Sequence, residues 1–228
     1  TNNIAIGNDA GGAITTGTDN VAIGTSALDA ATTAVNNVAI GSSALGANTV
    51  GTSNIAIGTN AMLLLTTGTG NVAIGTNTLD ATTTGVNNVA IGSAALGANT
   101  IGDSNIAIGK DALTLNTTGV NNISIGADSL ATQTVGVRNV GIGKSAMTAL
   151  TTGTDNIAIG ATALDAATTA VENVAIGTDA LGACTVGTFN VGIGDDALLV
   201  LTTATSCVAI GRDTLKAVTT GVDNTAIG

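Results

Sequence analysis

The 228-residue sequence contains no Trp, Tyr, His or Pro and only one Phe. Without aromatic rings it lacks the side chains that bury the largest apolar areas in ordinary globular cores. Without His it lacks the most common acid–base group near neutral pH, which is also the most common metal ligand. Two Cys are too few for a disulfide framework or a cysteine zinc site. These absences argue against a conventional globular enzyme, and we expect neither catalytic residues nor a cofactor.

Charge is also scarce, because charged residues make up 9% of the chain against about 25% in an ordinary soluble domain. The net charge of −10, with only five Lys and Arg, provides no basic surface for nucleic acid. No stretch of about 18 consecutive apolar residues is present, so we expect no insertion into a membrane.

A 17-residue repeat runs through the sequence. The pair Ile-Gly recurs from Ile6-Gly7 to Ile227-Gly228 in thirteen steps of 17 residues, without insertion or deletion. Counted from its Asn as column 1, the repeat reads N-[VI]-A-I-G-x-[DNST]-A-L-x-x-x-T-x-G-x-x, as in residues 20–36. A fixed period is typical of a solenoid, in which each column of the repeat has one structural role.

Columns 1 to 5 predict a short strand that ends at Gly. Val and Ile alternate with Ala, as in a half-buried strand, and we interpret Val and Ile as the side that fills the coil. The polar column 7, from Asp9 to Asp213 with only Ala94 departing, resembles helix N-caps and predicts a short helical turn. Column 13 is Thr throughout, from Thr15 to Thr219, and its β-branched surroundings predict a second short strand.

Together these elements predict an all-β fold with short helical turns: a parallel β-solenoid, or β-roll, of about 13 coils with 17 residues each. We expect residues 1–228 to form a single repetitive segment. The pattern starts and stops within a repeat and has no polar capping unit, so we also expect a fragment of a longer fibre, uncapped at both ends.

The thin coils predict contact with another chain. Three large apolar residues per coil, even with the hydrogen bonds between coils, barely offset the ordering of 17 residues, so a further face should be buried between copies. On our interpretation of the strand, column 3 faces outward, and its small side chains would let two backbones approach closely. The residues that we expect to pack between chains are Ala22, Ala39, Ala56, Ala73, Ala90 and Ala107.

Two groups of residues are candidates for binding. Asp179, Asp196 and Asp213 share column 7 of successive coils, and their stacked carboxylates are a weak candidate for a Ca²⁺ site. The alternative is that each Asp caps its own turn. Gly143-Lys144-Ser145 resembles part of a phosphate-binding loop, but Arg138 stands where that loop needs Gly, so we expect no nucleotide site.

The remaining columns have mainly structural interpretations. Cys184 and Cys207 lie in different columns of different coils, so we expect no disulfide between them, and we expect Cys184 to pack inside. The Asn side chains of column 1 should stack and bond along a corner of the coil; a ladder of ligand-binding amides is the alternative. Thr-x-Thr units such as Thr16–Thr18 suggest an ice-binding array, although Val50 and similar residues interrupt it.

The Asn-Val-Ala-Ile-Gly segment resembles the head repeats of trimeric autotransporter adhesins, whose period is shorter. The sequence is more similar to the AIG-type repeat of phage tail fibres and related bacterial surface proteins. Residues 71–85 (NVAIGTNTLDATTTG) and 224–228 (NTAIG) carry this resemblance, which extends over the whole chain. It implies a homotrimer located on a virion or a cell surface, with receptor binding in other domains of the same fibre.

We therefore expect a non-enzymatic, extracellular structural repeat that forms the shaft of a tail fibre or a cell-surface adhesin. Its partners would be further copies of itself and other domains of the fibre. Contact with a host or cell surface would belong to domains outside this chain. Two alternatives stay open: an ice-binding solenoid with a Thr array, and a self-assembling extracellular filament.

Overall fold

The computed structural model describes residues 2–228, which form two compact units, residues 2–118 and residues 119–228. Each unit is a parallel β-solenoid in which one three-residue strand recurs every 17 residues. The first unit contains β1 (Ile4–Ile6), β2 (Val21–Ile23), β3 (Val38–Ile40), β4 (Ile55–Ile57), β5 (Val72–Ile74), β6 (Val89–Ile91) and β7 (Ile106–Ile108). The second contains β8 (Ile123–Ile125), β9 (Val140–Ile142), β10 (Ile157–Ile159), β11 (Val174–Ile176), β12 (Val191–Ile193), β13 (Val208–Ile210) and β14 (Thr225–Ile227). The predicted all-β parallel solenoid is confirmed.

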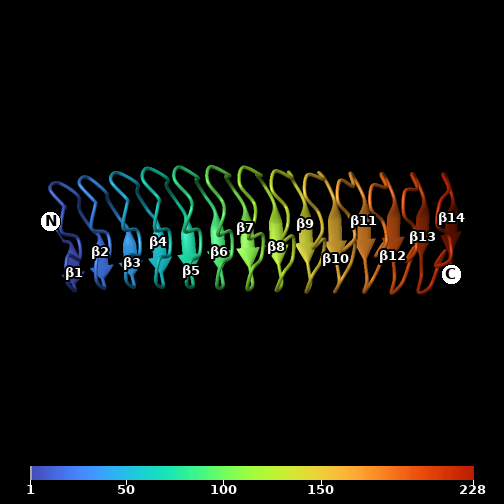
Figure 1. The fold of residues 1–228 in the computed structure, drawn as a ribbon, viewed down its shortest axis with the longest axis horizontal. Coiled ribbons are helices and arrows are strands. Elements are labelled where there is room, and N and C mark those ends of the chain that lie inside the picture. Colours follow the sequence, from blue (N-terminus) through green and yellow to red (C-terminus); the bar gives the residue numbers. More distant parts are fainter. Residues whose placement is uncertain (1) are drawn as a thin grey trace. The chain divides into compact units, whose positions relative to one another are not determined.

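Within each unit the strands lie side by side in sequence order (Figure 1), and every paired strand is parallel to its neighbour. Between β10 and β11, for example, Ala158 is aligned with Ala175 and Ile159 with Ile176. Because the register shift equals one repeat, each column of the sequence becomes a stack of side chains along the unit.

Tight turns follow each strand, and residues 2–228 contain no helix. The N–H of Gly46 donates to the carbonyl of Ser43 (3.2 Å), and the N–H of Asn48 donates to that of Leu45 (3.1 Å). Ser43 and Leu45 have φ angles of 57° and 52°, and columns 7 and 9 repeat this left-handed conformation. The predicted helical turn is therefore wrong. Asp, Asn and Ser suit helix N-caps, but Asp and Asn also tolerate left-handed backbone, so column 7 fits a turn equally well.

The predicted second strand around column 13 is also wrong. Among residues 2–228, regular pairing there is limited to single-residue bridges in column 16 of the second unit, of which Val137–Thr154 is the first. Column 13 instead bonds to the next coil directly. The N–H of Thr32 and its Oγ1 both donate to the carbonyl of Thr49, at 3.1 and 3.3 Å. The same hydroxyl bond, added to a backbone bond, recurs along both units.

The Gly of column 5 ends each strand, as predicted, for two physical reasons. Gly177 has a φ of 130°, which other residues rarely adopt. A Cβ added to it would lie 2.5 Å from the carbonyl carbon and oxygen of Gly194 in the next coil. The coils therefore approach each other at this corner as closely as bare backbone allows.

The core lies inside each coil, and it reverses the orientation that we expected for the strand. On β10, Ala158 is fully buried, whereas Ile157 and Ile159 are 37% and 38% exposed. The reason is space: the Leu of column 9 fills the narrow interior, so column 3 admits only small side chains. At Gly192, even an added Cβ would lie 3.2 Å from Cγ of Leu181.

The six alanines predicted to pack between chains consequently lie inside their own coils. At most 1% of each is exposed: Ala22, Ala39, Ala56, Ala73, Ala90 and Ala107. They offer no surface to a second chain, and the outward columns of the strand are those of Val and Ile.

Candidate functional site

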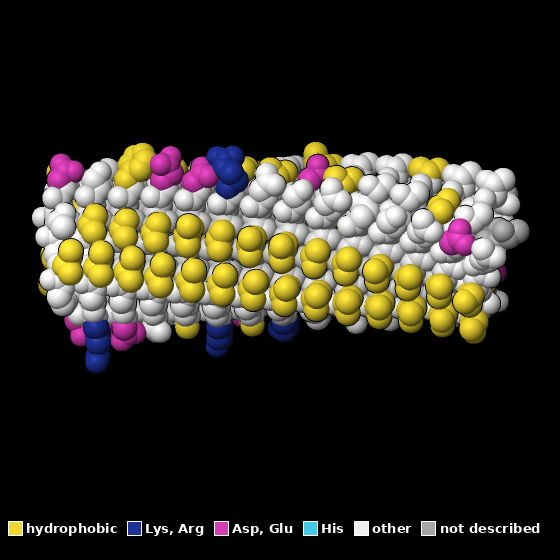
Figure 2. Space-filling model, turned by 180° about the vertical axis from the view of Figure 1, so that it is seen from behind, with side chains coloured by type: hydrophobic (Ala, Val, Ile, Leu, Met, Phe, Trp, Pro, Cys, Tyr) yellow, Lys and Arg dark blue, Asp and Glu magenta, His cyan; other side chains and the backbone are white. Residues whose placement is uncertain are grey.

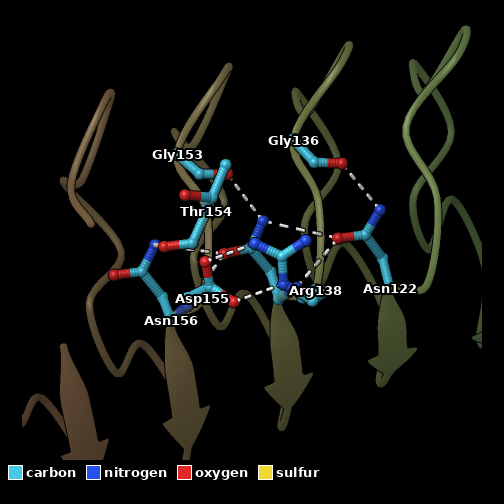
Figure 3. Close-up of polar contacts among 8 residues, drawn as sticks. Asn122, Gly136, Arg138, Gly153, Thr154, Asp155 and Asn156 are labelled. Atoms are coloured by element: carbon cyan, nitrogen blue, oxygen red, sulfur yellow. Dashed lines mark hydrogen bonds and ion pairs between the residues drawn. The ribbon is translucent and has the colours of Figure 1, made fainter. Parts of the chain in front are cut away.

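Buried Asn side chains of column 1 form a ladder of hydrogen bonds (Figure 3). The backbone N–H of Asn139 donates to Oδ1 of Asn122 (3.0 Å), and its Nδ2 donates to the carbonyl of Gly153 (2.7 Å). Its own Oδ1 accepts from the backbone N–H (3.1 Å) and from Nδ2 (3.0 Å) of Asn156. The same pattern recurs from coil to coil in both units.

This ladder uses the bonding capacity of its amides internally. A primary amide has two donor hydrogens and an acceptor oxygen with two lone pairs, and in Asn139 all four are engaged. Leaving such groups unpaired in a core costs about 1–3 kcal/mol each. The prediction that column 1 stacks and bonds along the coil is confirmed, and amides occupied in this way have no capacity left for a ligand.

Cys207 takes the place of Asn in one coil and weakens the ladder there. Its backbone N–H still donates to Oδ1 of Asn190 (3.0 Å). Its sulfur is the only side-chain acceptor that it offers to Nδ2 of Asn224, at 3.6 Å. Sulfur is a weak acceptor, so this contact is a poor substitute for an amide oxygen.

Outward side chains of columns 2 and 4 form a double row of Val and Ile over the strands of each unit, which we call the apolar stripe. Figure 2 shows the two rows, with some charged side chains projecting just below them and others at the upper edge, beyond a wide band of uncharged atoms. Column 4 is Ile in every strand, and Thr225 is the one departure from Val and Ile in column 2. The sequence analysis missed this surface because it placed these side chains inside the coil.

A second outward surface consists of columns 14 and 16, whose side chains flank the buried Gly or Ala of column 15. It contains the Thr-x-Thr units that suggested an ice-binding array. Column 14 is exposed throughout the described coils, but Val and Ile interrupt its Thr residues. The interrupting residues are Val50 (45% exposed), Ile101 (54%), Val135 (45%) and Val186 (46%).

The candidate calcium ligands bond to other protein groups. Nζ of Lys216 lies 2.6 Å from Oδ2 of Asp196 and 2.8 Å from Oδ1 of Asp213. Asp179 accepts a hydrogen bond from Oγ1 of Thr162 (2.5 Å). Within residues 2–228, no three His, Cys, Asp or Glu side chains are placed to hold a metal ion. The lysine hydrogen bond lowers the pKa of Asp213, so this column is better described as an ion pair than as a cation site.

Arg138 and Asp155 form a bidentate ion pair on column 17 (Figure 3), with Nε–Oδ1 and Nη2–Oδ2 distances of 2.6 and 2.7 Å. The hydrogen bonds from Arg138 lower the pKa of Asp155. The pKa shift has the opposite direction in column 10, where burial raises the pKa of Asp80 and of Asp165. Exposed ion pairs contribute little to stability, so we assign Arg138–Asp155 a minor structural role.

Neither cysteine nor the lysine loop forms a reactive site. Cys184 and Cys207 are both buried and free, and burial raises the pKa of the Cys184 thiol. The predicted packing of Cys184 inside the coil is confirmed. Lys144 is exposed, and the tight turn that follows it lacks the helix N-terminus that a phosphate-binding loop supplies.

Residues 2–228 form no pocket, and they include no helix long and apolar enough to cross a membrane. No protein-family model matches the chain, and no curated protein matches it. The Asn ladder and the apolar stripe are therefore the most regular features of residues 2–228.

Proposed function

We propose that the chain is a non-enzymatic structural repeat that forms part of the shaft of a fibrous extracellular protein, a tail fibre or a cell-surface adhesin. The observation that carries this proposal is the bonding between coils. Backbone groups, the Asn ladder and the Thr hydroxyls of column 13 all bond to residues about one repeat away. These bonds run along each unit, where a shaft must resist extension and unravelling.

The remaining surface supports a passive role. Charge is sparse, and Phe189 is the only aromatic ring available for stacking against a ligand such as a glycan. Recognition of a host or a cell surface would then belong to other domains of the same fibre. In this proposal the partners of the chain are those domains and further copies of itself, three in number if the family resemblance holds.

The location and role can be tested with antibodies raised against the purified chain. Immunogold electron microscopy of the source cells and of any virions they release should place gold along projecting fibres. Gold confined to the cell interior would contradict the proposal. The number of copies is measured separately by light scattering after size exclusion, where three times the 21.6 kDa chain mass would support a homotrimer.

Ice binding is a second candidate, favoured by one observation. Columns 14 and 16 lie on the same side of the coil and repeat at the spacing of stacked strands, about 4.8 Å. Their side chains are β-branched except at Asp103, and column 16 is partly buried in most coils. Thermal hysteresis measured on the purified chain tests this candidate. A freezing point equal to the melting point at high protein concentration would eliminate it.

A further inference from the structure

We propose that residues 71–138 form a weak segment, four repeats in which the coils open more readily than in the repeats before and after it, residues 54–70 and 139–155. Opening here means that hydrogen bonds between successive coils break reversibly while the rest of the chain stays folded. In a fibre under tension this segment would extend first, a role that rests on the proposed shaft. The weakness itself follows from the side chains inside the coils.

Buried polar side chains gather in the weak segment. Apart from the Asn ladder of column 1, the buried polar side chains of residues 2–228 are Asn48, Thr78, Thr82, Asn99, Asn116, Ser124, Ser129 and Gln133. All of these except Asn48 lie within residues 71–138. Column 12 is polar in each of the four repeats, with Thr82, Asn99 and Asn116 in the first unit and Gln133 in the second.

The repeats on either side of the weak segment have apolar interiors. Column 12 is Leu65 in the repeat before it and Leu150 in the repeat after it, and both side chains are fully buried. The same repeats place Met62 and Met147, also fully buried, in column 9. Because Leu removes much more apolar surface from water than Thr or Asn, closing a coil over Leu65 is more favourable than closing one over Asn99.

Hydrogen bonds inside the weak segment only partly replace this burial. Nδ2 of Asn99 donates to the carbonyl of Gly102 (3.1 Å), and Oδ1 of Asn99 accepts from Nδ2 of Asn116 (3.1 Å). Oγ1 of Thr82 donates to the carbonyl of Asn99 (2.9 Å). When a coil opens, water takes over these bonds, so their net contribution is small, whereas water offers no such compensation to an exposed Leu.

Backbone bonds between coils do not offset the difference, because they are alike inside and outside the weak segment. The N–H groups of Val72 and Val89, inside it, each donate to the Asn carbonyl of the next coil at 2.8 Å. Those of Val38 and Val140, outside it, make the same bond at 2.9 and 2.8 Å. The filling of the coil is therefore what distinguishes the two kinds of repeat.

Hydrogen exchange at these four amides, followed by NMR, tests the proposal. Each Val follows an Asn, so the amides have closely similar intrinsic exchange rates. Under conditions in which exchange reports local opening, we expect the amides of Val72 and Val89 to exchange roughly tenfold faster than those of Val38 and Val140. Equal or slower exchange within the weak segment would overturn the proposal.

A first variant fills the weak segment. The double change Asn99→Leu and Asn116→Val gives column 12 the pair that the chain itself has at Leu201 and Val218. Both members of the amide pair are replaced together, so neither is left to face an apolar side chain. We expect exchange at the amide of Val89 to slow roughly tenfold. Unchanged exchange in the folded variant would overturn the proposal.

A second variant makes the reverse change and does not depend on folding of the first. Leu150→Asn places an amide in column 12, a change that Asn48 shows to be compatible with the coil, since its side chain bonds to both the N–H (2.9 Å) and the carbonyl (3.2 Å) of Gly51. Exchange at the amide of Val140 should accelerate roughly tenfold. The control Thr152→Val, on the exposed column 14 of the same repeat, should leave it unchanged.

Unchanged exchange at Val140 in the Leu150→Asn variant, or equal acceleration by the control, would overturn the proposal. Either result would leave the shaft proposal standing, because a shaft with uniform coils is still a shaft. Gold labelling confined to the cell interior would defeat the shaft and the role under tension, and would leave the difference in exchange intact.

Discussion

Adjacent residues on one strand show how differently the two sides of the coil are constrained. Column 3, inside, holds only Ala, Ser and Gly, because the Leu of column 9 leaves no further room. Columns 2 and 4, outside, hold Val and Ile almost without exception, although these side chains are partly exposed, Ile157 and Ile159 by 37% and 38%. Lack of space explains the first pattern, and the stacking of β-branched side chains on neighbouring strands accounts for the second. The outer side of the strand therefore accepts branched side chains that the interior of the coil has no room for.

Substitutions of side chains inside the coil should reduce stability most, above all in the Asn ladder. Asn156→Ala removes the acceptor for the backbone N–H of Asn173 and the donor to the carbonyl of Ala170. At about 1–3 kcal/mol for each buried group left unpaired, we expect the free energy of unfolding to fall by roughly 2–6 kcal/mol. Chemical denaturation measures this loss. The control Thr152→Ala, on the exposed column 14, should change it by less than about 0.5 kcal/mol.

A smaller loss of stability is expected when a larger side chain is placed inside the coil. Ala158→Leu adds three carbon atoms where the interior is already full, which should cost about 1–3 kcal/mol. Its neighbour Ile157 faces outward, so Ile157→Leu should leave the unfolding midpoint nearly unchanged. Equal destabilisation by the two substitutions would contradict the assignment of inner and outer sides. Both are measured by thermal and denaturant unfolding.

The sequence predicts the architecture because the repeat is unbroken. A fixed 17-residue step, a strand ended by Gly and an Asn at the same corner are sufficient to predict stacked parallel coils and the bonded Asn column. The period requires that residues such as Asn139 and Asn156 meet. These predictions depend on spacing alone, which is why the structure confirms them.

The alternation of Val, Ala and Ile does not show which side of the strand faces the interior of the coil. Val-Ala-Ile alternates identically whether Ala or the larger residues point inward, and general hydrophobicity favours the wrong choice. The signal was in the substitutions: Ser124, Gly141 and Gly192 keep column 3 small, whereas Thr225 is accepted in column 2. The turn was missed for a similar reason, since Asp and Asn suit both helix N-caps and left-handed backbone.

Replacing Cys207, the residue that weakens the Asn ladder, by Asn should increase the free energy of unfolding. Cys207→Asn restores an amide oxygen for Asn224 and an amide donor toward the carbonyl of Gly221, where the sulfur now lies at 3.6 Å. We expect a gain of about 1 kcal/mol, the net contribution of a typical hydrogen bond. Hydrogen exchange at the amide of Asn224 should slow, because its local opening becomes less favourable. Unchanged exchange would show that the sulfur is already an adequate partner at this position, and faster exchange would show that the amide does not fit there.

The smallest effect on stability is expected from breaking the exposed Arg138–Asp155 ion pair of column 17. Arg138 lowers the pKa of Asp155, so their interaction stabilises the fold above the unfolded carboxyl pKa of about 3.9 and is lost as the pH falls through the lower, folded value. Arg138→Asn keeps a residue suited to the φ of 57° and removes the cation. The pKa of Asp155, followed by NMR, should then rise toward its ordinary value, with little change in stability at neutral pH.

Asp165 is the internal control. Its pKa is raised mainly by burial, so it should keep its value in the variant and contribute to stability in the opposite direction as the pH falls. A shift of Asp165 that equals the shift of Asp155 would mean that the substitution disturbs the coil as a whole, and the difference between buried and exposed columns would not hold for their carboxylates.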